Sequence, residues 1–373
     1  MPVLRVALLL DPLSAHIKGA EHAHELAREL ARRGHTLRAF GATLADDAAP
    51  GSPSSAVERL APSSVIEFAP DAVIAYDALS PAAWLGARAA RRLQVPLVVV
   101  EAGLFVRGSL LERSLWRIGH SLWGAYVRRT TAELVALDSV ARELALRDGF
   151  APDRCRIVPH GVDPERFRPG LTSSLVARHR IVGRVLACAS NLDARSGVEP
   201  LIAAFAKTLA QRGDWALAIA GRGAGHARAR ACAERLGVGA RVHFLLDAEP
   251  DDLPGLFSAS TLYAEPTLDF DKPALGVLQA LACGTPVLAS KLPRLDEVIA
   301  SSSAGVSVEP GSVAAWADAI SSAAYSPDAR ARWSEAGVQH ARERASWSHV
   351  ADEFEHALRG AGGDAATALP LAS

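Results

Sequence analysis

The 373-residue chain is almost balanced in charge, with 40 basic and 41 acidic side chains, and 49 % of its residues are hydrophobic. This composition is typical of a folded protein of about two domains and excludes wholesale disorder. Nucleic-acid-binding proteins usually carry a basic excess, so no nucleic-acid partner is predicted. The four cysteines lack a C-x-x-C pair and the twelve histidines lack a metal-binding spacing. We therefore expect a reduced, cytoplasmic protein without a metal or another cofactor.

The basic residues are almost all arginine, with lysine only at positions 18, 207, 272 and 291. We interpret this as a bias of genomic composition. A single arginine is then weak evidence for a site, and arginine can stand where a related protein carries lysine. The apolar start of the chain is expected to be a first strand and not a signal peptide, and no run is long enough for a transmembrane helix.

Strand-like and helix-like runs alternate along the chain. In the first half we expect strands at 4–10, 36–39, 72–75, 96–100 and 134–136, helices at 21–34, 81–93 and 139–148, and loops at 44–55 and 58–64. In the second half we expect strands at 185–189, 215–220, 242–245, 261–264 and 286–289, and helices at 197–212, 224–236, 253–259 and 276–282. Alternation with continuously apolar strands predicts an α/β fold with two doubly wound parallel sheets.

The two halves meet near the Pro- and Arg-containing stretch 164–172. Open α/β sheets bind ligands beyond the carboxyl ends of their strands, so a ligand site is expected in a cleft shared by the halves. A last amphipathic helix is expected at 347–358. The small, polar residues from 360 to 373 are expected to be a disordered tail.

Three segments could contribute to a ligand site. Gly19 lies where the first strand gives way to a helix, whose N-terminus favours an anion, although a plain turn is the alternative. His160 lies in the Pro- and Gly-containing segment 157–169, which is either a linker or part of the site. Gly276 opens a helix after the acidic loop 266–271, where phosphate oxygens could bind, and an ordinary connection is again the alternative.

Together these segments resemble the retaining family 4 glycosyltransferases (glycosyl transferases group 1), which have the GT-B fold. The resemblance rests on Gly19-Ala20-Glu21, on Pro159-His160-Gly161-Val162-Asp163, on Cys283-Gly284-Thr285-Pro286 and on Trp347 with the last helix. It implies two Rossmann-like domains facing a central cleft. An acceptor domain would span 1–165, a nucleotide-sugar donor domain would span 166–345, and a helix at 346–359 would cross back to the first domain.

The resemblance also implies where a donor diphosphate would bind. The family's arginine and lysine for this group fall on Asn191 and Ser196, so both charges are missing. Arg195 is adjacent and could substitute, since a long arginine can reach a phosphate, or it is a surface arginine. Gly221, after a strand, is a further expected nucleotide-binding position.

The family's paired acids, eight positions apart, fall on Asp271 and Gln279. By this resemblance Asp271 would meet the hydroxyls of the sugar and Gln279 those of the ribose. Gln279 keeps the capacity to form hydrogen bonds but has no charge. Asp269 is the alternative for the first acid.

On the acceptor side, the family's histidine falls on Ala102, beside Glu101. Glu101 would reach a ligand only if its strand has ended there, because neighbouring strand residues point to opposite faces. The family's His-x-His segment falls on residues 75–77. Tyr76 and Asp77 could therefore face the acceptor, or they are an ordinary core tyrosine and loop aspartate.

The segment 107–129 combines Trp116, Trp123 and Tyr126 with several arginines. A basic aromatic face suits an anionic membrane surface or a lipid-linked acceptor, and an amphipathic helix with its aromatic residues in the core is the alternative.

The sequence thus supports two hypotheses. The first is a metal-independent retaining glycosyltransferase that moves a sugar from a nucleotide diphosphate sugar to a small-molecule, glycan or lipid-linked acceptor. The second is a non-catalytic protein of the same fold that binds a partner glycosyltransferase, a glycan or a nucleotide. The protein would be cytoplasmic, with peripheral contact to the inner face of the membrane left open.

Overall fold

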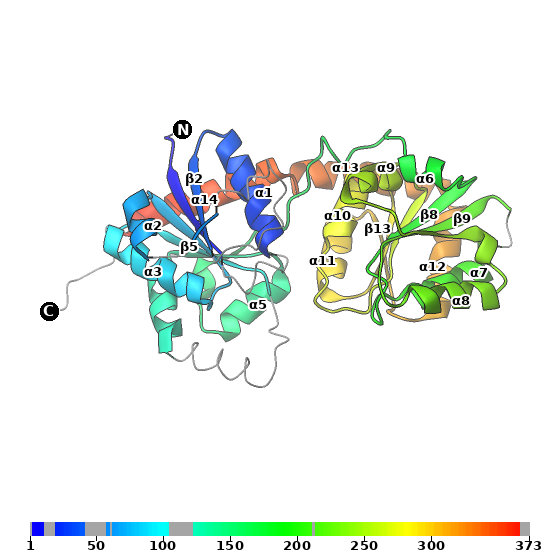
Figure 1. Cartoon of the computed structure of the whole chain (residues 1–373), viewed down its shortest axis with the longest axis horizontal. Helices are drawn as coiled ribbons and strands as arrows, with labels where there is room; N and C mark the ends of the chain where they lie inside the picture. Colours follow the sequence, from blue (N-terminus) through cyan, green and yellow to red (C-terminus); the bar gives the residue numbers. More distant parts are fainter. Residues whose placement is uncertain are drawn as a thin grey trace. The chain divides into compact units, whose positions relative to one another are not determined.

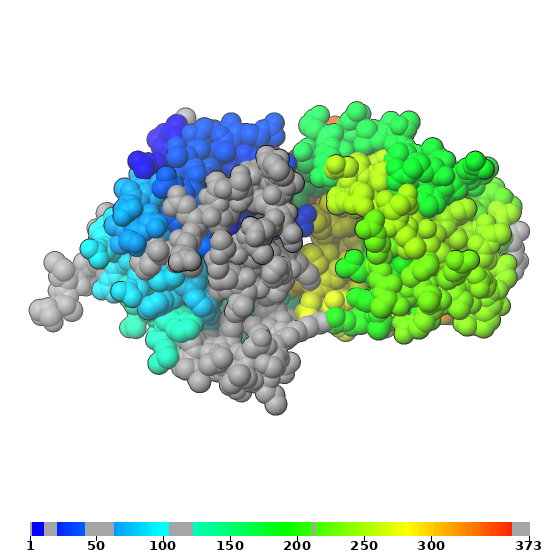
Figure 2. Space-filling model, viewed as in Figure 1, coloured from blue at the N-terminus to red at the C-terminus, as the bar shows by residue number. Residues whose placement is uncertain are grey.

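The computed structural model describes residues 2–10, 19–41, 57–59, 62–103, 122–210 and 213–365. The chain divides into two compact units, one made of residues 1–161 and 347–373 and the other of residues 162–346. Figure 1 shows the first unit in blue and cyan with one red helix, and the second in green to orange. The second unit is coloured almost throughout in Figure 2, because only residues 211 and 212 of it lie outside the described ranges.

The first unit contains a seven-stranded sheet in the order β3-β2-β1-β4-β5-β6-β7. All its strand pairs are parallel. In the register of β4 and β5, Tyr76 lies opposite Val100. The strands are β1 (Arg5–Leu9), β2 (Thr36–Gly41), β3 (Val57–Arg59), β4 (Ala72–Tyr76), β5 (Leu97–Glu101), β6 (Glu133–Ala136) and β7 (Cys155–Ile157).

Helices cover both faces of this sheet. Successive strand residues point to opposite faces, so β4 buries Val73 and Ala75 against α3 and buries Ile74 and Tyr76 against α1 and α14. The helix over residues 122–130 belongs to the first unit as well. The other helices of this unit are α1 (Gly19–Arg32), α2 (Pro62–Phe68), α3 (Pro81–Leu93), α5 (Ser139–Arg147), the 3-10 turn Pro152–Arg154 and α14 (Trp347–Ala365).

The second unit contains a six-stranded parallel sheet in the order β10-β9-β8-β11-β12-β13. Its strands are β8 (Arg184–Ala189), β9 (Trp215–Ala220), β10 (Val242–Leu245), β11 (Leu262–Glu265), β12 (Val287–Ser290) and β13 (Gly305–Val308). Its helices are α6 (Ser174–Arg178), α7 (Val198–Lys207), α8 (His226–Arg235), α9 (Leu253–Ser258), α10 (Leu275–Ala282), α11 (Pro293–Ser302), α12 (Val313–Tyr325) and α13 (Pro327–Glu343), with 3-10 turns at Gly239–Arg241 and Pro250–Asp252.

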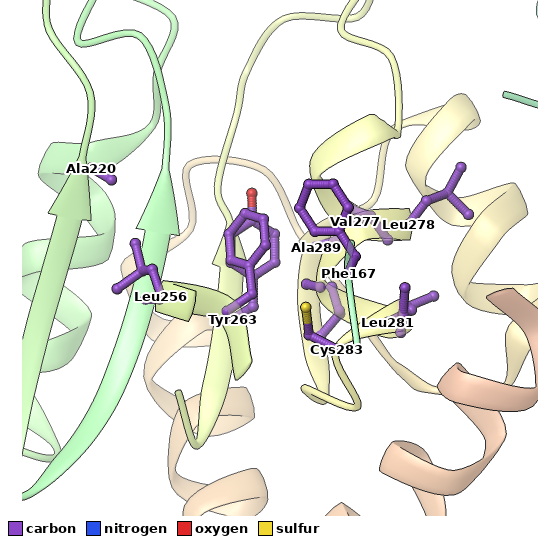
Figure 3. Packing of buried hydrophobic residues seen from close by; sticks show 14 of the residues in the cluster. Phe167, Ala220, Leu256, Tyr263, Val277, Leu278, Leu281, Cys283 and Ala289 are labelled. Carbon is purple, nitrogen blue, oxygen red and sulfur yellow. The ribbon is translucent and has the colours of Figure 1, made fainter. Parts of the chain in front are cut away.

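One of the two apolar cores of this unit lies between the sheet and helices α9, α10 and α13. Phe167, Leu256, Tyr263 and Leu281 are buried in it, and Figure 3 shows the Tyr263 ring among apolar side chains with its hydroxyl at one end. Burying such a side chain contributes about 1.5–3 kcal/mol of transfer free energy. The fixed core holds the carboxyl end of β11, and the loop that follows it, in place.

The prediction of two doubly wound parallel sheets is confirmed, and two local predictions were wrong. Residues 58–64 were expected to be a loop, but β3 and the start of α2 lie there. A three-residue edge strand is too short to show a hydrophobic period. Helix α14 continues to Ala365, past the expected start of a disordered tail at 360. Propagating an existing helix costs little compared with nucleating one, even through glycines. Residues 366–373 lie outside the described part of the chain.

Candidate functional site

The carboxyl ends of β8, β9 and β11 lie at one edge of the second sheet, and close backbone contacts join the loops that follow them. A Cβ atom on Gly197 would lie 1.8 Å from the carbonyl oxygen of Pro266, and one on Gly221 would lie 2.1 Å from that of Ser190. Both glycines have positive φ angles, +68° and +137°. Only glycine fits such positions, so the three loops form one closely packed surface. Gly221, predicted to bind a nucleotide, has a packing role here.

Arg195 and Asp269 meet on this surface. The Arg195 Nη1 atom lies 3.3 Å from Asp269 Oδ1, and 47 % of the arginine side chain is exposed. The backbone N–H of Leu268 donates to the Arg195 carbonyl at 2.8 Å. The backbone N–H of Asp271 donates to Asp269 Oδ1 at 3.2 Å. The structure therefore brings Arg195, Asp269 and Asp271, three of the predicted donor-site residues, into one place.

Lys272 and Glu265 form a second ion pair here, which the sequence reasoning missed. The Lys272 ammonium donates to Glu265 Oε1 at 2.9 Å, and the Tyr263 hydroxyl donates to Glu265 Oε2 at 2.9 Å. Glu265 is 1 % exposed and Lys272 is 25 % exposed. The charge of Glu265 raises the pKa of Lys272 against the lowering effect of burial. The scarcity of lysine in an arginine-rich chain was the signal that could have identified it.

The other predicted donor-site residues take different environments. Ser196 is buried and donates to a carbonyl within its own loop, whereas Asn191 is exposed. Gly276 lies in the first turn of α10, where a Cβ atom would lie 2.8 Å from the Tyr263 hydroxyl. Gln279 lies half-buried on the next turn of α10. A ligand role for Asn191, Gly276 and Gln279 stays a prediction, and Ser196 is a position at which the family's charge is missing.

At the carboxyl edge of the first sheet, Asp77 and Glu101 are neighbours. The register pairs Tyr76 with Val100, so Asp77 and Glu101 are the next residues along the two neighbouring segments. The backbone N–H of Asp77 donates to the Val100 carbonyl at 2.8 Å. Glu101 is the last residue of β5, as a role at the end of the strand requires.

Glu101 is nevertheless almost fully buried, at 5 % exposure. Its carboxyl group accepts the backbone N–H of Gly103 at 2.8 Å and that of Ala78 at 3.3 Å. Burial, followed by the charge of Asp77, raises the pKa of Glu101 to about 8. The group is therefore mainly protonated at neutral pH, when it can donate as well as accept a hydrogen bond.

Tyr76 lies on the opposite face and is buried. Its hydroxyl is 2.8 Å from Nδ1 of His22 on α1. The His22 ring also lies edge-on to His160 and Trp347, with ring centroids 5.2 and 5.1 Å away. Burial, with a smaller effect of His160, holds the pKa of His22 well below its usual value. Tyr76 thus has the environment of a core tyrosine, which was the alternative left open by the sequence.

Gly161 and Trp347, which flank the second unit in the sequence, pack against each other beside this cluster. A Cβ atom on Gly161 would lie 2.3 Å from the Trp347 ring, so the residues before and after the second unit pack tightly together within the first unit. Val162 and Ser346, the first and last residues of the second unit, form an isolated parallel bridge. Gly19 begins α1, and residues 11–18 before it lie outside the described ranges.

The segment 107–129, for which the sequence left open a membrane-facing surface and an amphipathic helix, is described only from residue 122 onward, as a helix. The indole N–H of Trp123 donates to the Leu79 carbonyl at 3.0 Å, and both Trp123 and Tyr126 pack against the first unit's core. Within the described residues, no helix is long and apolar enough to cross a membrane. Within the same ranges, no group of three His, Cys, Asp or Glu side chains could hold a metal ion.

Comparison with known proteins bears on this fold and site. The family model described as Glycosyltransferase Family 4 matches residues 19–166, and that described as Glycosyl transferases group 1 matches residues 182–340. The D-inositol 3-phosphate glycosyltransferases of Corynebacterium glutamicum and Segniliparus rotundus are both 31 % identical to the chain. The alignments cover 54 % and 56 % of this chain. The chain spans about half the length of these curated relatives, 51 % and 48 %.

Solved structures with the same fold cover nearly the whole chain. A glycosyltransferase from Rickettsia africae ESF-5 aligns with a TM-score of 0.80 at 14 % identity, over 97 % of this chain and 99 % of its own. Anabaena Alr3699/HepE in complex with UDP and glucose aligns with a TM-score of 0.69 at 17 % identity, over 95 % and 99 %. Two matching family models and this fold confirm the resemblance seen in the sequence: the chain belongs to glycosyltransferase family 4 and has the GT-B fold.

Proposed function

We propose that this protein is a retaining glycosyltransferase that uses a nucleotide diphosphate sugar as donor. The observation that carries the proposal is the rigid surface at the carboxyl edge of the second sheet, where Arg195, Asp269 and Asp271 gather in a chain of this family. A cation, hydrogen-bonding carboxylates and fixed loops are what binding a diphosphate and a sugar requires. The Anabaena neighbour, described in complex with UDP and glucose, supports the same ligand class.

In the proposed reaction, Asp271 binds the sugar hydroxyls, Gln279 the ribose and Arg195 the diphosphate. The bond between the sugar's anomeric carbon and the diphosphate oxygen breaks, and a bond to the acceptor oxygen forms on the same face. The acceptor's proton passes to the leaving diphosphate, so no protein nucleophile is needed. The charge that develops on the leaving group is stabilised by cationic side chains, and we propose that no metal is required.

We assign acceptor binding to the first unit, at the carboxyl edge beside Asp77 and Glu101. A protonated Glu101 can both donate a hydrogen bond to a hydroxyl group and accept one from it, and the Asp77 carboxyl group lies beside it. The acceptor is a small molecule, a glycan or a lipid-linked sugar.

The test begins with calorimetric binding and thermal shift against UDP, GDP, ADP and their sugar conjugates. A ligand at about 100 times its Kd stabilises the folded state by about 2.7 kcal/mol. We expect the protein to bind nucleotides of one base more tightly than those of the other two. If none of these nucleotides binds at millimolar concentration, the proposal fails, and the non-catalytic hypothesis that the missing charges at Asn191 and Ser196 suggested takes its place.

Turnover is tested with the Asp271→Ala variant and the selected sugar nucleotide. Release of the nucleoside diphosphate by slow transfer to water needs no identified acceptor. Asp271→Ala should abolish it with an unchanged Tm, and Asp318→Ala, an exposed aspartate on α12, is the matched control. A chelator should leave the rate unchanged.

A further inference from the structure

The ion pair with Glu265 uses only part of the hydrogen-bonding capacity of the Lys272 ammonium. An ammonium group has three N–H donors, and among the described residues Glu265 is the one acceptor of a hydrogen bond from it, at 2.9 Å. A quarter of the Lys272 side chain is exposed, whereas Glu265 is 1 % exposed. The pair therefore presents its positive member towards solvent and its negative member towards the core.

The surroundings fix the lysine in this position. The second carboxylate oxygen of Glu265 is occupied by the Tyr263 hydroxyl, so the carboxylate cannot turn away. The backbone N–H of Lys272 donates to the Asp269 carbonyl at 3.1 Å, and Arg294 donates to the neighbouring Asp271 carbonyl at 3.0 Å. Lys272 is thus a cation held in advance on the surface that carries the predicted donor-site residues.

The charge of this surface is otherwise largely compensated. Arg195 lies against Asp269, and half of its side chain is exposed, where water screens its charge. Asp193 contributes a further negative charge that raises the pKa of Lys272. Ser196 and Asn191 carry no charge. Lys272 is more shielded from water than Arg195, so an incoming anion interacts with it more strongly.

We propose that Lys272 binds the diphosphate of the donor and supplies the positive charge that Asn191 and Ser196 lack. This inference rests on the proposed function. The compact ammonium, with two N–H donors left, suits a phosphate oxygen while still bound to Glu265. The first turn of α10, beginning three residues later, adds backbone N–H groups that favour an anion at the same place.

The experiment separates this role from simple neutralisation of Glu265. Binding of UDP, GDP and ADP, and of uridine, guanosine and adenosine, is measured by calorimetry. Lys272→Gln should weaken binding of the selected nucleoside diphosphate by about 10- to 100-fold, which is the range for a hydrogen bond to a charged group. It should leave the affinity for the corresponding nucleoside unchanged. The control Lys207→Gln removes an exposed lysine at the C-terminal end of α7 and should change neither the affinity for the diphosphate nor that for the nucleoside.

Because Lys272→Gln leaves the buried Glu265 without its cationic partner, the double variant Glu265→Gln/Lys272→Gln is the decisive one. It removes both charges together and keeps two amides that can bind each other. We expect it to fold with a Tm near that of the wild type and to bind the diphosphate as weakly as the single variant. Glu265→Gln alone should bind the diphosphate at least as tightly as the wild type.

If the double variant binds the diphosphate as the wild type does, Lys272 only neutralises Glu265 and the inference is wrong, while the proposed function stands. If the wild type binds no diphosphate, the proposed function and this inference fail together. If Lys272→Gln weakens binding of the nucleoside and of the diphosphate equally, the lysine only maintains the structure of the site, and the inference that it contacts phosphate is wrong.

Discussion

Replacing Glu101 by glutamine should reverse its effect on stability between acid and alkaline pH. In the unfolded chain this carboxyl group loses its proton near pH 4.5, whereas in the folded first unit it keeps the proton up to about pH 8. Between these values the folded state binds more protons than the unfolded state. The contribution of Glu101 to stability therefore falls as the pH rises. One pKa unit corresponds to about 1.4 kcal/mol. The shift from 4.5 to about 8 thus costs about 5 kcal/mol once the pH exceeds 8.

Glutamine has no charge to bury, but it fits the site imperfectly. Its oxygen can accept one of the two backbone N–H groups, from Gly103 or Ala78, and its NH₂ group faces the other. Leaving such a donor unsatisfied costs about 1–3 kcal/mol. At pH 5, Glu101→Gln should therefore be less stable than the wild type by about 1–3 kcal/mol. At pH 9 it should be more stable by about 2–4 kcal/mol, which is the difference between the two costs.

Urea denaturation at pH 5, 7 and 9 measures this reversal. Hydrogen exchange of peptides from β4 and β5 reports the first unit separately from the second. Glu67→Gln, at an exposed position on α2, is the control and should show no reversal. A variant that is less stable than the wild type at every pH would refute the reasoning, because Glu101 would then ionise with an ordinary pKa.

Three further predictions concern packing and thiol chemistry. Gly161→Ala should destabilise the protein by about 1–3 kcal/mol, since its Cβ atom would lie 2.3 Å from the Trp347 ring. The control Gly239→Ala should lower stability less, because its Cβ atom would lie 3.6 Å from the nearest side-chain atom, Cγ of Glu234. An equal decrease of Tm in the two variants would contradict the steric effect expected at Gly161. Phe354→Ala, which empties a buried site on α14, should cost about 3–5 kcal/mol by urea denaturation. Alkylation of the native protein should label the partly exposed Cys155 before the three buried cysteines, and mass spectrometry of the labelled peptides would show any other order.

The sequence predicted the elements that have a strong hydrophobic period. Continuous apolar strands such as β1, β5 and β9 and the amphipathic α1 were found with small errors at their ends. Short edge elements such as β3 and β7 were missed, because three residues carry no period. No element was predicted between residues 290 and 346, where α11, β13, α12 and α13 lie. The strand register that places Asp77 beside Glu101 depends on contacts between segments far apart in the sequence.

The sequence pointed to only part of the surface at the carboxyl edge of the second sheet. Asp271 was named because a family position falls on it, Arg195 because it is adjacent to a position that has lost its charge, and Asp269 as the alternative acid; their role in donor binding stays a prediction. Lys272 and Glu265 were missed, because the sequence does not show that they form an ion pair, and the rarity of lysine was the only local signal for Lys272. The packing roles of Gly197 and Gly221 likewise depend on backbone atoms of other loops. Close approach between loops has no local sequence signal beyond the glycine itself.

The order of the two units along the chain has a consequence for synthesis on the ribosome. The second unit is inserted between residues 161 and 347, so all its strands are made before α14. Until α14 emerges, the face of the first sheet that packs against Val350, Ala351 and Phe354 is covered by α1 alone among these two helices. The inserted unit can then complete its fold while the earlier one still exposes apolar surface to chaperones. Helix α14 thus completes the first unit only after the second unit has been synthesised.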